Sequence, residues 1–149
     1  MAEVRVEWRA PMVFVGGPAG AAPVLMDASP EAGGTGVAPS PMETVLAALA
    51  GCSGIDVVSI LQKMRAPLAG LRIDVAGERA PEPPRVFTAI RMRYTAWGPG
   101  LDPEAVRRAV ALSLDRYCSV AAMLRATAAI THEVVVAPGD AVDRPPVAS

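Results

Sequence analysis

Apolar residues recur along much of the chain with the period of a β-strand. Six short segments alternate apolar and polar side chains or carry a brief apolar run between turn residues. In a half-buried strand, every second side chain faces the core, so these segments predict strands. The segments are residues 4–8, 12–15, 23–27, 71–78, 85–97 and 130–137.

A long segment after the third predicted strand has helical start and stop signals instead. Ser40 and Glu43 have the spacing of a capping box, and Pro41 suits the first helical position. The segment predicts a helix that ends near Arg65, because Pro67 disfavours helical geometry in the residue before it.

A second helix is expected from the N-cap Asp102 to about Leu114, and a short helix is expected over residues 120–126. The order is strands, long helix, strands, helix and strand. This order predicts an α+β fold, with helices on one side of an antiparallel sheet.

The long helix is apolar on nearly every side, so it requires cover on every side. One sheet covers only one side. We therefore predict a homodimer with this helix near its centre; the alternative is a monomer whose later helices complete the cover. Gly51 and Gly54 each cost about 1 kcal/mol inside a helix, which favours close helix packing or room for a ligand.

Composition narrows the class of protein further. A chain of 149 residues with a net charge of −1 fits one domain, which we expect over residues 1–137, and has no basic footprint for nucleic acid. The polar, proline-rich residues 138–149 are expected to be disordered. The start of the chain lacks a leader-like apolar region, and no uninterrupted apolar run reaches about 18 residues, so we expect a cytoplasmic protein without a membrane contact.

The chemically reactive candidates are two cysteines. Cys52 lies at the centre of the long helix, and Cys118 follows the second helix 66 residues later. With a single histidine, His132, and no Cys-x-x-Cys motif, a metal site is not expected. From the residues alone, the cysteines are either inert core residues or a reactive pair.

The amino-acid sequence around both cysteines closely resembles that of one protein family. The stretch "SPMETVLAALAGCSGIDVV", followed by "RYCSVAAML", resembles the OsmC/Ohr family of osmotically inducible protein C-like and organic hydroperoxide resistance proteins. The likeness runs from about Val4 to Val136 and is nearest to the uncharacterised OsmC-like branch. It implies an intertwined homodimer with two long central helices backed by sheets.

The resemblance also implies thiol peroxidase chemistry. In this scheme Cys52 attacks a hydroperoxide and becomes a sulfenic acid, and Cys118 condenses with it to a disulfide. An external dithiol then reduces the disulfide. The substrates are organic hydroperoxides, and no metal, haem or flavin is required.

Activation of the Cys52 thiol needs a cation, because the residue lies too far inside its helix for the helix dipole to act. In the family, an arginine serves this role and a carboxylate near the helix start holds it. Residues 28–39 contain no arginine, and only Arg5 and Arg9 precede them. Glu43 lies about 180° around the helix from Cys52, so its capping role is the better interpretation.

Asp56 lies one turn beyond Cys52, where its charge disfavours a thiolate unless it orients a cation. Arg116 is the candidate cation; the alternative is a solvated arginine at a helix end. Four methionines either line a hydroperoxide pocket or simply pack: Met42, Met64, Met92 and Met123.

Three functions remain open from the sequence. The first is a Cys52- and Cys118-dependent hydroperoxide reductase. The second is a non-enzymatic dimer that binds a small apolar or thiol-reactive ligand, and the third is a redox sensor. The lack of an arginine in residues 28–39 and the position of Asp56 favour the binding protein, whereas the paired cysteines favour the enzyme.

Overall fold

The structure is a computed structural model that describes residues 1–138. The expected disorder of the C-terminal tail therefore falls almost wholly outside the described residues. The chain divides into two compact units, residues 1–47 and residues 48 onward, and each is described by itself. A single domain over residues 1–137 stays a prediction.

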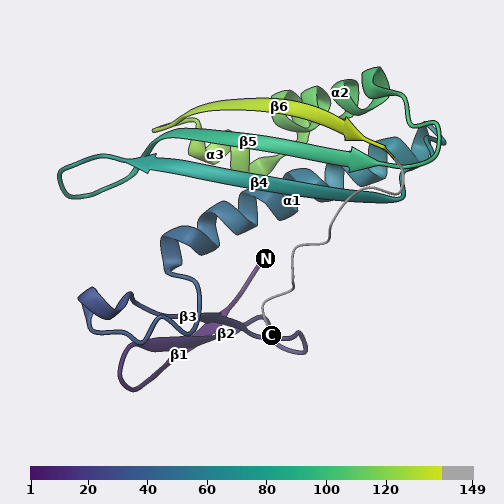
Figure 1. Cartoon of the computed structure of the whole chain (residues 1–149). Coiled ribbons are helices and arrows are strands. Elements are labelled where there is room, and N and C mark those ends of the chain that lie inside the picture. The colour runs from purple at the N-terminus through teal and green to yellow at the C-terminus, as the bar shows by residue number, and fades with distance from the viewer. Residues whose placement is uncertain (139–149) are drawn as a thin grey trace. The chain divides into compact units, whose positions relative to one another are not determined.

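The N-terminal unit contains a three-stranded antiparallel sheet, with strand order β1-β2-β3 (Figure 1). Its strands are β1 (Arg5–Arg9), β2 (Val13–Gly17) and β3 (Val24–Met26). Gly16 pairs with Val6, and a Cβ atom at Gly16 would lie 1.9 Å from the carbonyl oxygen of Arg5. Close pairing of β1 and β2 therefore requires a glycine at this position.

A buried carboxylate organises the loop that leads into the long helix. The Asp27 side chain accepts hydrogen bonds from the backbone N–H groups of Ala28, Thr35 and Val37, and from the Thr35 hydroxyl at 2.8 Å. Burial acts to raise the pKa of Asp27, but these hydrogen bonds outweigh burial and the pKa is lowered. The ionised side chain thus holds the loop, which includes a short 3-10 helix at Pro30–Ala32.

Helix α1 (Pro41–Lys63) starts with the predicted capping box. The backbone N–H of Ser40 donates to the Glu43 carboxylate at 3.1 Å, and the backbone N–H of Glu43 donates to the Ser40 hydroxyl at 3.1 Å. These hydrogen bonds lower the pKa of Glu43. The capping interpretation of Glu43 is confirmed.

Helix α1 ends at Lys63, two residues before the predicted end, and is followed by a residue in the left-handed conformation. Arg65 has φ = 55°, and its N–H donates to the Gln62 carbonyl while the Ala66 N–H donates to the Leu61 carbonyl. This pair of hydrogen bonds is a Schellman motif, which usually places glycine where Arg65 stands.

The C-terminal unit contains a second three-stranded sheet with order β4-β5-β6 (Figure 1). Its strands are β4 (Gly70–Arg79), β5 (Phe87–Trp97) and β6 (Ala129–Ala137). The α+β class is confirmed, and β4 and β5 are antiparallel as expected. The pairing of β6 differs, because β6 runs parallel to β5. The chain crosses over through helices between these strands and returns to the end at which β5 began.

The crossover consists of α2 (Pro103–Leu112), a π-helical turn η2 (Ser113–Tyr117) and α3 (Ser119–Leu124). Asp102 caps α2 as predicted, by accepting a hydrogen bond from the Glu104 N–H at 3.0 Å. The expected regular helix to Leu114 instead ends at Leu112 and continues as the π-helical turn. Such turns occur mostly inside α-helices and often near functional sites.

Alternate residues of β5 separate a buried face from an exposed face. Ile90, Met92 and Tyr94 are buried, whereas Arg91 and Arg93 between them are exposed. The buried face packs with the helices in the core of the C-terminal unit. Other fully buried core residues are Leu49, Val57 and Leu61 of α1 and Val106, Ala109 and Val110 of α2.

Within one chain, α1 is buried along one stripe and not on all sides. Its buried residues recur every fourth position: Leu49, Ser53, Val57 and Leu61. On another side, Ile55 is 72% exposed. The helix is long and apolar enough to cross a membrane by length and composition, although the buried stripe shows that it packs against the core of the C-terminal unit.

Candidate functional site

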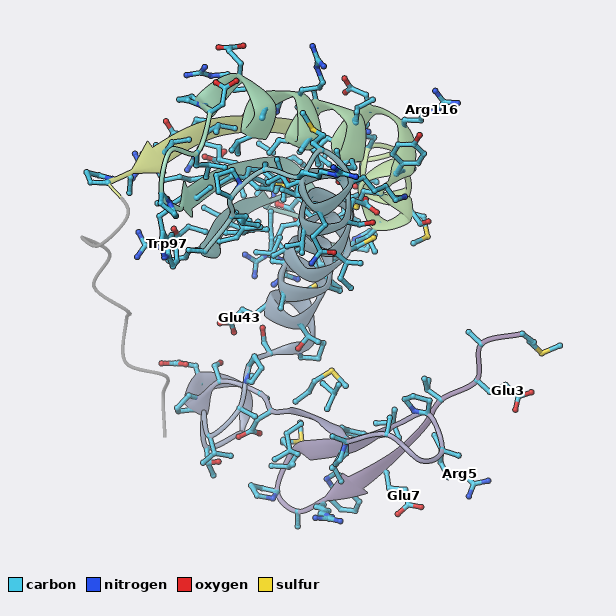
Figure 2. All side chains as sticks on the ribbon, turned by 90° about the vertical axis from the view of Figure 1, so that its right-hand side faces the viewer. Glu3, Arg5, Glu7, Glu43, Trp97 and Arg116 are labelled. Carbon is cyan, nitrogen blue, oxygen red and sulfur yellow. The ribbon has the colours of Figure 1, made fainter. Side chains whose placement is uncertain are left out.

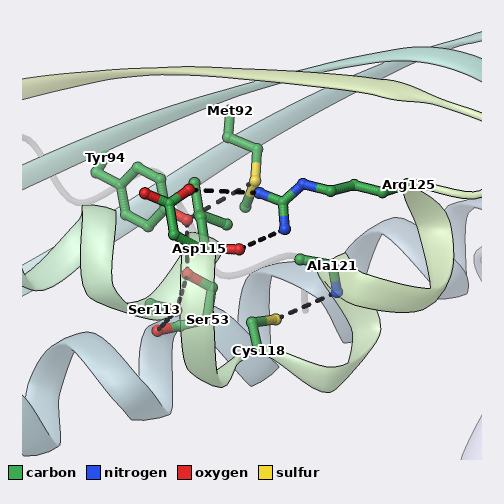
Figure 3. A network of polar contacts seen from close by, with 9 residues as sticks. Ser53, Met92, Tyr94, Ser113, Asp115, Cys118, Ala121 and Arg125 are labelled. Carbon is green, nitrogen blue, oxygen red and sulfur yellow. Dashed lines mark hydrogen bonds and ion pairs between the residues drawn. The ribbon is translucent and has the colours of Figure 1, made fainter.

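The two cysteines are both free and both belong to the C-terminal unit. Cys52 is partly buried on α1, next to the fully buried Ser53. Cys118 is only 3% exposed and is the N-cap residue of α3. Its sulfur accepts a hydrogen bond from the Ala121 N–H at 3.4 Å (Figure 3). The π-helical turn that precedes Cys118 thus places the Cys118 thiol at the N-terminal end of α3.

The environment of Cys118 keeps its proton on the sulfur. Burial, the largest cause, raises the pKa of the Cys118 thiol to about 11, against a smaller lowering effect of the Ala121 N–H. The neighbouring Cys52 and Asp56 side chains raise the pKa of Cys118 further. Cys52, Asp56 and Cys118 are therefore close enough to interact, and Cys118 is a neutral thiol near pH 7.

A chain of buried hydroxyl groups joins Tyr94, Ser53 and Ser113 (Figure 3). The Ser53 Oγ atom lies 2.6 Å from the Tyr94 Oη atom and 2.8 Å from the Ser113 Oγ atom. Ser113 donates to the Asp56 carboxylate at 2.9 Å. Because an ionised carboxylate only accepts hydrogen bonds, Asp56 orients the hydroxyls so that Tyr94 donates to Ser53 and Ser53 donates to Ser113.

The tyrosine at the inner end of this chain is also neutral over the physiological range. Burial is the main reason that the pKa of Tyr94 rises to about 12, while the hydrogen bond with Ser53 acts in the opposite direction. The neighbouring Cys118 and Asp56 side chains raise the pKa of Tyr94 further. Tyr94 therefore serves as a hydrogen-bond donor in the core and not as a proton acceptor.

The structure of one chain does not bring the candidate cation Arg116 to Asp56. No ion pair joins these two residues within residues 1–138, and the Arg116 guanidinium instead lies 5.5 Å from the centre of the Tyr117 ring. Figure 2 shows Arg116 at the edge of the C-terminal unit, pointing away from the helices. The π-helical turn carries Ser113 inward to Asp56 and leaves Arg116 on the outside.

An arginine that the sequence analysis did not consider, Arg125, contacts the turn before Cys118. Arg125 follows α3 and donates a hydrogen bond back to the Leu114 carbonyl, and it lies 3.9 Å from the Asp115 carboxylate (Figure 3). It is not among the groups that shift the pKa of Cys118. In the part of the chain that the structure describes, no cation is therefore identified as an activator of the cysteines.

Two hollows lie in the C-terminal unit near α1. A groove of about 860 Å³ is lined by small and apolar residues of α1 and β4, including Gly51, Gly54 and Ile55. A smaller cavity of about 370 Å³ is lined by residues that include Asp56 and Met64. Met92 is buried, Met123 is 67% exposed, and neither lines this cavity.

Sequence reasoning missed the hydroxyl cluster of Ser53, Tyr94 and Ser113. Ser53 offered a weak signal, since it is a polar residue in an apolar helix. Its partners lie 41 and 60 residues away, and no local pattern connects them. No group of three or more potential metal ligands occurs within residues 1–138.

A family model of OsmC-like proteins matches residues 33–133. This chain therefore belongs to the OsmC-like family, as the sequence resemblance predicted. It is 46% identical over 138 residues to protein YhfA of Escherichia coli (strain K12). This match covers 91% of this chain and 99% of YhfA.

Solved structures share the fold. A hypothetical protein from Aquifex aeolicus VF5 is 29% identical, with a TM-score of 0.76 over 92% of this chain and 98% of that chain. An organic hydroperoxide resistance protein OsmC from Legionella pneumophila is 16% identical, with a TM-score of 0.67 over 91% of this chain and 97% of that chain. At 16% identity the likeness concerns the fold alone.

Proposed function

We propose that this protein is a cysteine-dependent reductase of organic hydroperoxides. The observation that carries the proposal is that Cys52, the other of the chain's two cysteines, is near enough to the buried Cys118 to raise the pKa of its thiol, as is Asp56. Membership of a family that includes organic hydroperoxide resistance proteins supports the same chemistry. Cys52 is the proposed attacking residue, because Cys118 is almost fully buried and holds its proton.

The proposed cycle has three balanced steps. The Cys52 thiolate attacks the terminal oxygen of the hydroperoxide, the O–O bond breaks, and the leaving alkoxide takes a proton and departs as an alcohol. The Cys118 thiol then condenses with the Cys52 sulfenic acid, which forms a disulfide and releases water. A thiol reductant, which the family scheme describes as a dithiol, returns the protein to its reduced state.

We also propose that the working form is a cytoplasmic homodimer. The groove along α1 and β4 and the exposed Ile55 give the C-terminal unit an apolar surface that a second subunit would cover. The high apolar content of α1 is consistent with that role. Glu43 remains assigned to the helix cap, and Arg116 to the surface.

The rival function is ligand binding or redox sensing without turnover. It is favoured by one observation: among the described residues 1–138, no guanidinium acts on Cys118. A cysteine attacks a peroxide as its thiolate, and a nearby cation is one of the groups that favour this form.

One experiment separates these functions. Reduced protein is mixed with cumene hydroperoxide, and its mass and free thiols are followed in the wild type and in Cys52→Ser and Cys118→Ser variants. A peroxidase gives an intramolecular disulfide in the wild type, a trapped sulfenic acid in Cys118→Ser and no reaction in Cys52→Ser. Turnover with a dithiol distinguishes an enzyme from a sensor. If both thiols survive excess peroxide, the reductase proposal is wrong.

A further inference from the structure

Asp56 places a negative charge beside the residue that is proposed to attack the hydroperoxide. It lies four residues after Cys52 on α1, a spacing that brings the Cβ atoms of a helix to within about 5–6 Å of each other. A carboxylate beside a thiol disfavours the thiolate, which is the form that attacks a peroxide. As a charge alone, Asp56 is therefore a disadvantage in the first step of the proposed cycle.

Asp56 and Cys118 are both hydrogen-bonded to one residue, Ser113. The Ser113 hydroxyl donates to the Asp56 Oδ2 atom at 2.9 Å, and the Cys118 backbone N–H donates to the Ser113 carbonyl at 2.8 Å. Ser113 is fully buried at the start of the π-helical turn, so both contacts are held in the core. The carboxylate is thus close to both cysteines, to Cys52 along α1 and to Cys118 across Ser113.

The contact with Ser113 leaves one oxygen of the carboxylate available. Among the hydrogen bonds of residues 1–138, Asp56 accepts only the one from Ser113, on Oδ2. An ionised carboxylate has further acceptor sites, including the lone pairs of Oδ1. Asp56 also lines the cavity of about 370 Å³, whereas Cys118 is only 3% exposed. Asp56 therefore combines a fixed position in the core with the capacity to accept a proton.

The second step of the proposed cycle requires removal of the Cys118 proton. The sulfur attacks as a thiolate, whereas the pKa of this buried thiol is raised to about 11. At pH 7 only about one such thiol in ten thousand is ionised. The Ala121 N–H stabilises the thiolate once it forms but does not remove the proton. Tyr94, a titratable group of β5 that interacts with Cys118, holds its own proton. Cys118 therefore needs a base beside it.

We propose that Asp56 is the proton acceptor for Cys118 in the disulfide-forming step. The Asp56 carboxylate takes the proton as the Cys118 sulfur attacks the sulfur of the Cys52 sulfenic acid. The S–S bond forms and the S–O bond breaks, and the proton passes to the leaving hydroxyl group, which departs as water. General base catalysis of this kind contributes about 100- to 10,000-fold to a rate. This role rests on the proposed function, but proton removal can be tested without a hydroperoxide.

The test replaces the sulfenic acid by an aromatic mixed disulfide on Cys52. Reduced protein reacts with one equivalent of dithiobis(nitrobenzoate), and the release of the coloured thionitrobenzoate anion is followed by stopped-flow absorbance. The first release comes from attack by Cys52, and the second comes from attack by Cys118 on the mixed disulfide. Because thionitrobenzoate leaves without taking up a proton, the second rate constant reports proton removal from Cys118. Cys118→Ser should show the first phase only.

Two roles of Asp56 predict opposite results for Asp56→Asn. If the carboxylate accepts the proton, the second phase slows about 100-fold or more at pH 7, which is the result we expect. If the carboxylate acts only as a negative charge, its removal lowers the pKa of Cys118 and the second phase becomes faster. The first phase should be as fast as in the wild type or faster, because the charge that opposes a Cys52 thiolate is gone.

Two readouts separate proton transfer from a structural role. In Asp56→Asn, the second rate constant should rise about tenfold per pH unit between pH 7 and 9, as the thiolate fraction of Cys118 does. The wild-type rate should change much less, because its own base replaces hydroxide. In Asp56→Ala, formate should restore the second phase in proportion to its concentration, since this small carboxylate fits the cavity that Asp56 lines. A variant that merely misfolds gives neither result.

Asp115→Asn is the matched control. Asp115 belongs to the same turn, but its side chain is exposed and lies 3.9 Å from Arg125, so its loss should change neither phase. A second phase in Asp56→Asn as fast as in the wild type, or faster, would overturn the inference. Slowing with neither the pH dependence nor the rescue by formate would also overturn it. Two phases in a wild type whose thiols survive hydroperoxide would refute the reductase alone and keep the role of Asp56.

Discussion

The hydroxyl cluster makes a sharp prediction about stability. Ser53→Ala removes the central member of the chain that joins Tyr94, Ser53 and Ser113, all of which are fully buried. The substitution leaves a small void and removes two hydrogen bonds. In the variant, Tyr94 keeps only a long contact of 3.7 Å to the Met92 sulfur.

The size of the effect follows from what each group loses. A buried donor or acceptor left without a partner costs about 1–3 kcal/mol. Ser113 keeps its bond to Asp56, so the main loss falls on Tyr94, and we expect Ser53→Ala to lower the free energy of unfolding by about 2 kcal/mol. Tyr94→Phe removes the same bond from the other side and should cost about 1–2 kcal/mol.

The assay is urea unfolding followed by circular dichroism, at one protein concentration for all variants. In the double variant, Ser53→Ala with Tyr94→Phe, both partners of the shortest bond are absent. Its loss should be smaller than the sum of the single losses by about 1 kcal/mol. Ser59→Ala, on the same helix and without a side-chain hydrogen bond within residues 1–138, should change stability by less than about 0.5 kcal/mol.

Two results would refute this reasoning. Additive losses in the double variant would mean that Ser53 and Tyr94 do not share a bond. A loss in Ser53→Ala no larger than that in Ser59→Ala would mean that the cluster is hydrated in solution and contributes no net stability.

Three further predictions concern other parts of the molecule. Arg65→Gly should raise the free energy of unfolding by about 0.5–1 kcal/mol in the same urea assay, because glycine adopts the left-handed conformation at this helix end without strain; a loss would contradict the Schellman assignment. Gly16→Val should disrupt the pairing of β1 with β2, because its Cβ would overlap the Arg5 carbonyl, and loss of amide-exchange protection in these strands would reveal it; native protection would disprove it. The folded-state pKa of Cys118 lies near 11, above its ordinary value of 9.0, so its contribution to stability is complete below about pH 9 and is lost as the pH rises towards 11. Stability of the wild type should therefore fall relative to Cys118→Ala across this interval, and a constant difference would count against the assignment.

Much of the fold could be predicted because it depends on neighbouring residues. The capping box of Ser40 and Glu43 spans four positions, and the same two residues make both hydrogen bonds in the structure. The alternation in β5 separates Ile90 and Tyr94 from Arg91 in the same way. Local hydrogen bonding and side-chain periodicity depend on residues that are close in the sequence, so both can be predicted from the sequence alone.

The candidate site was only partly predictable from the sequence. The two cysteine segments identified the family, and the cysteines interact in the structure, but their catalytic roles remain proposals. The suggested partner of Asp56 was Arg116, whereas its observed partner is Ser113. The π-helical turn shifts the register of the residues after Leu112, and regular helical spacing cannot anticipate that shift.

The sequence by itself determined the α+β class, the position of the long helix with its cap, and the family to which the chain belongs. Only the tertiary structure decided that β6 runs parallel to β5, that Tyr94, Ser53 and Ser113 form one hydrogen-bonded chain, and that Cys118 holds its proton. These features depend on contacts between segments dozens of residues apart. Burial and the charges of distant neighbours determine them, and both exist only once the chain has folded.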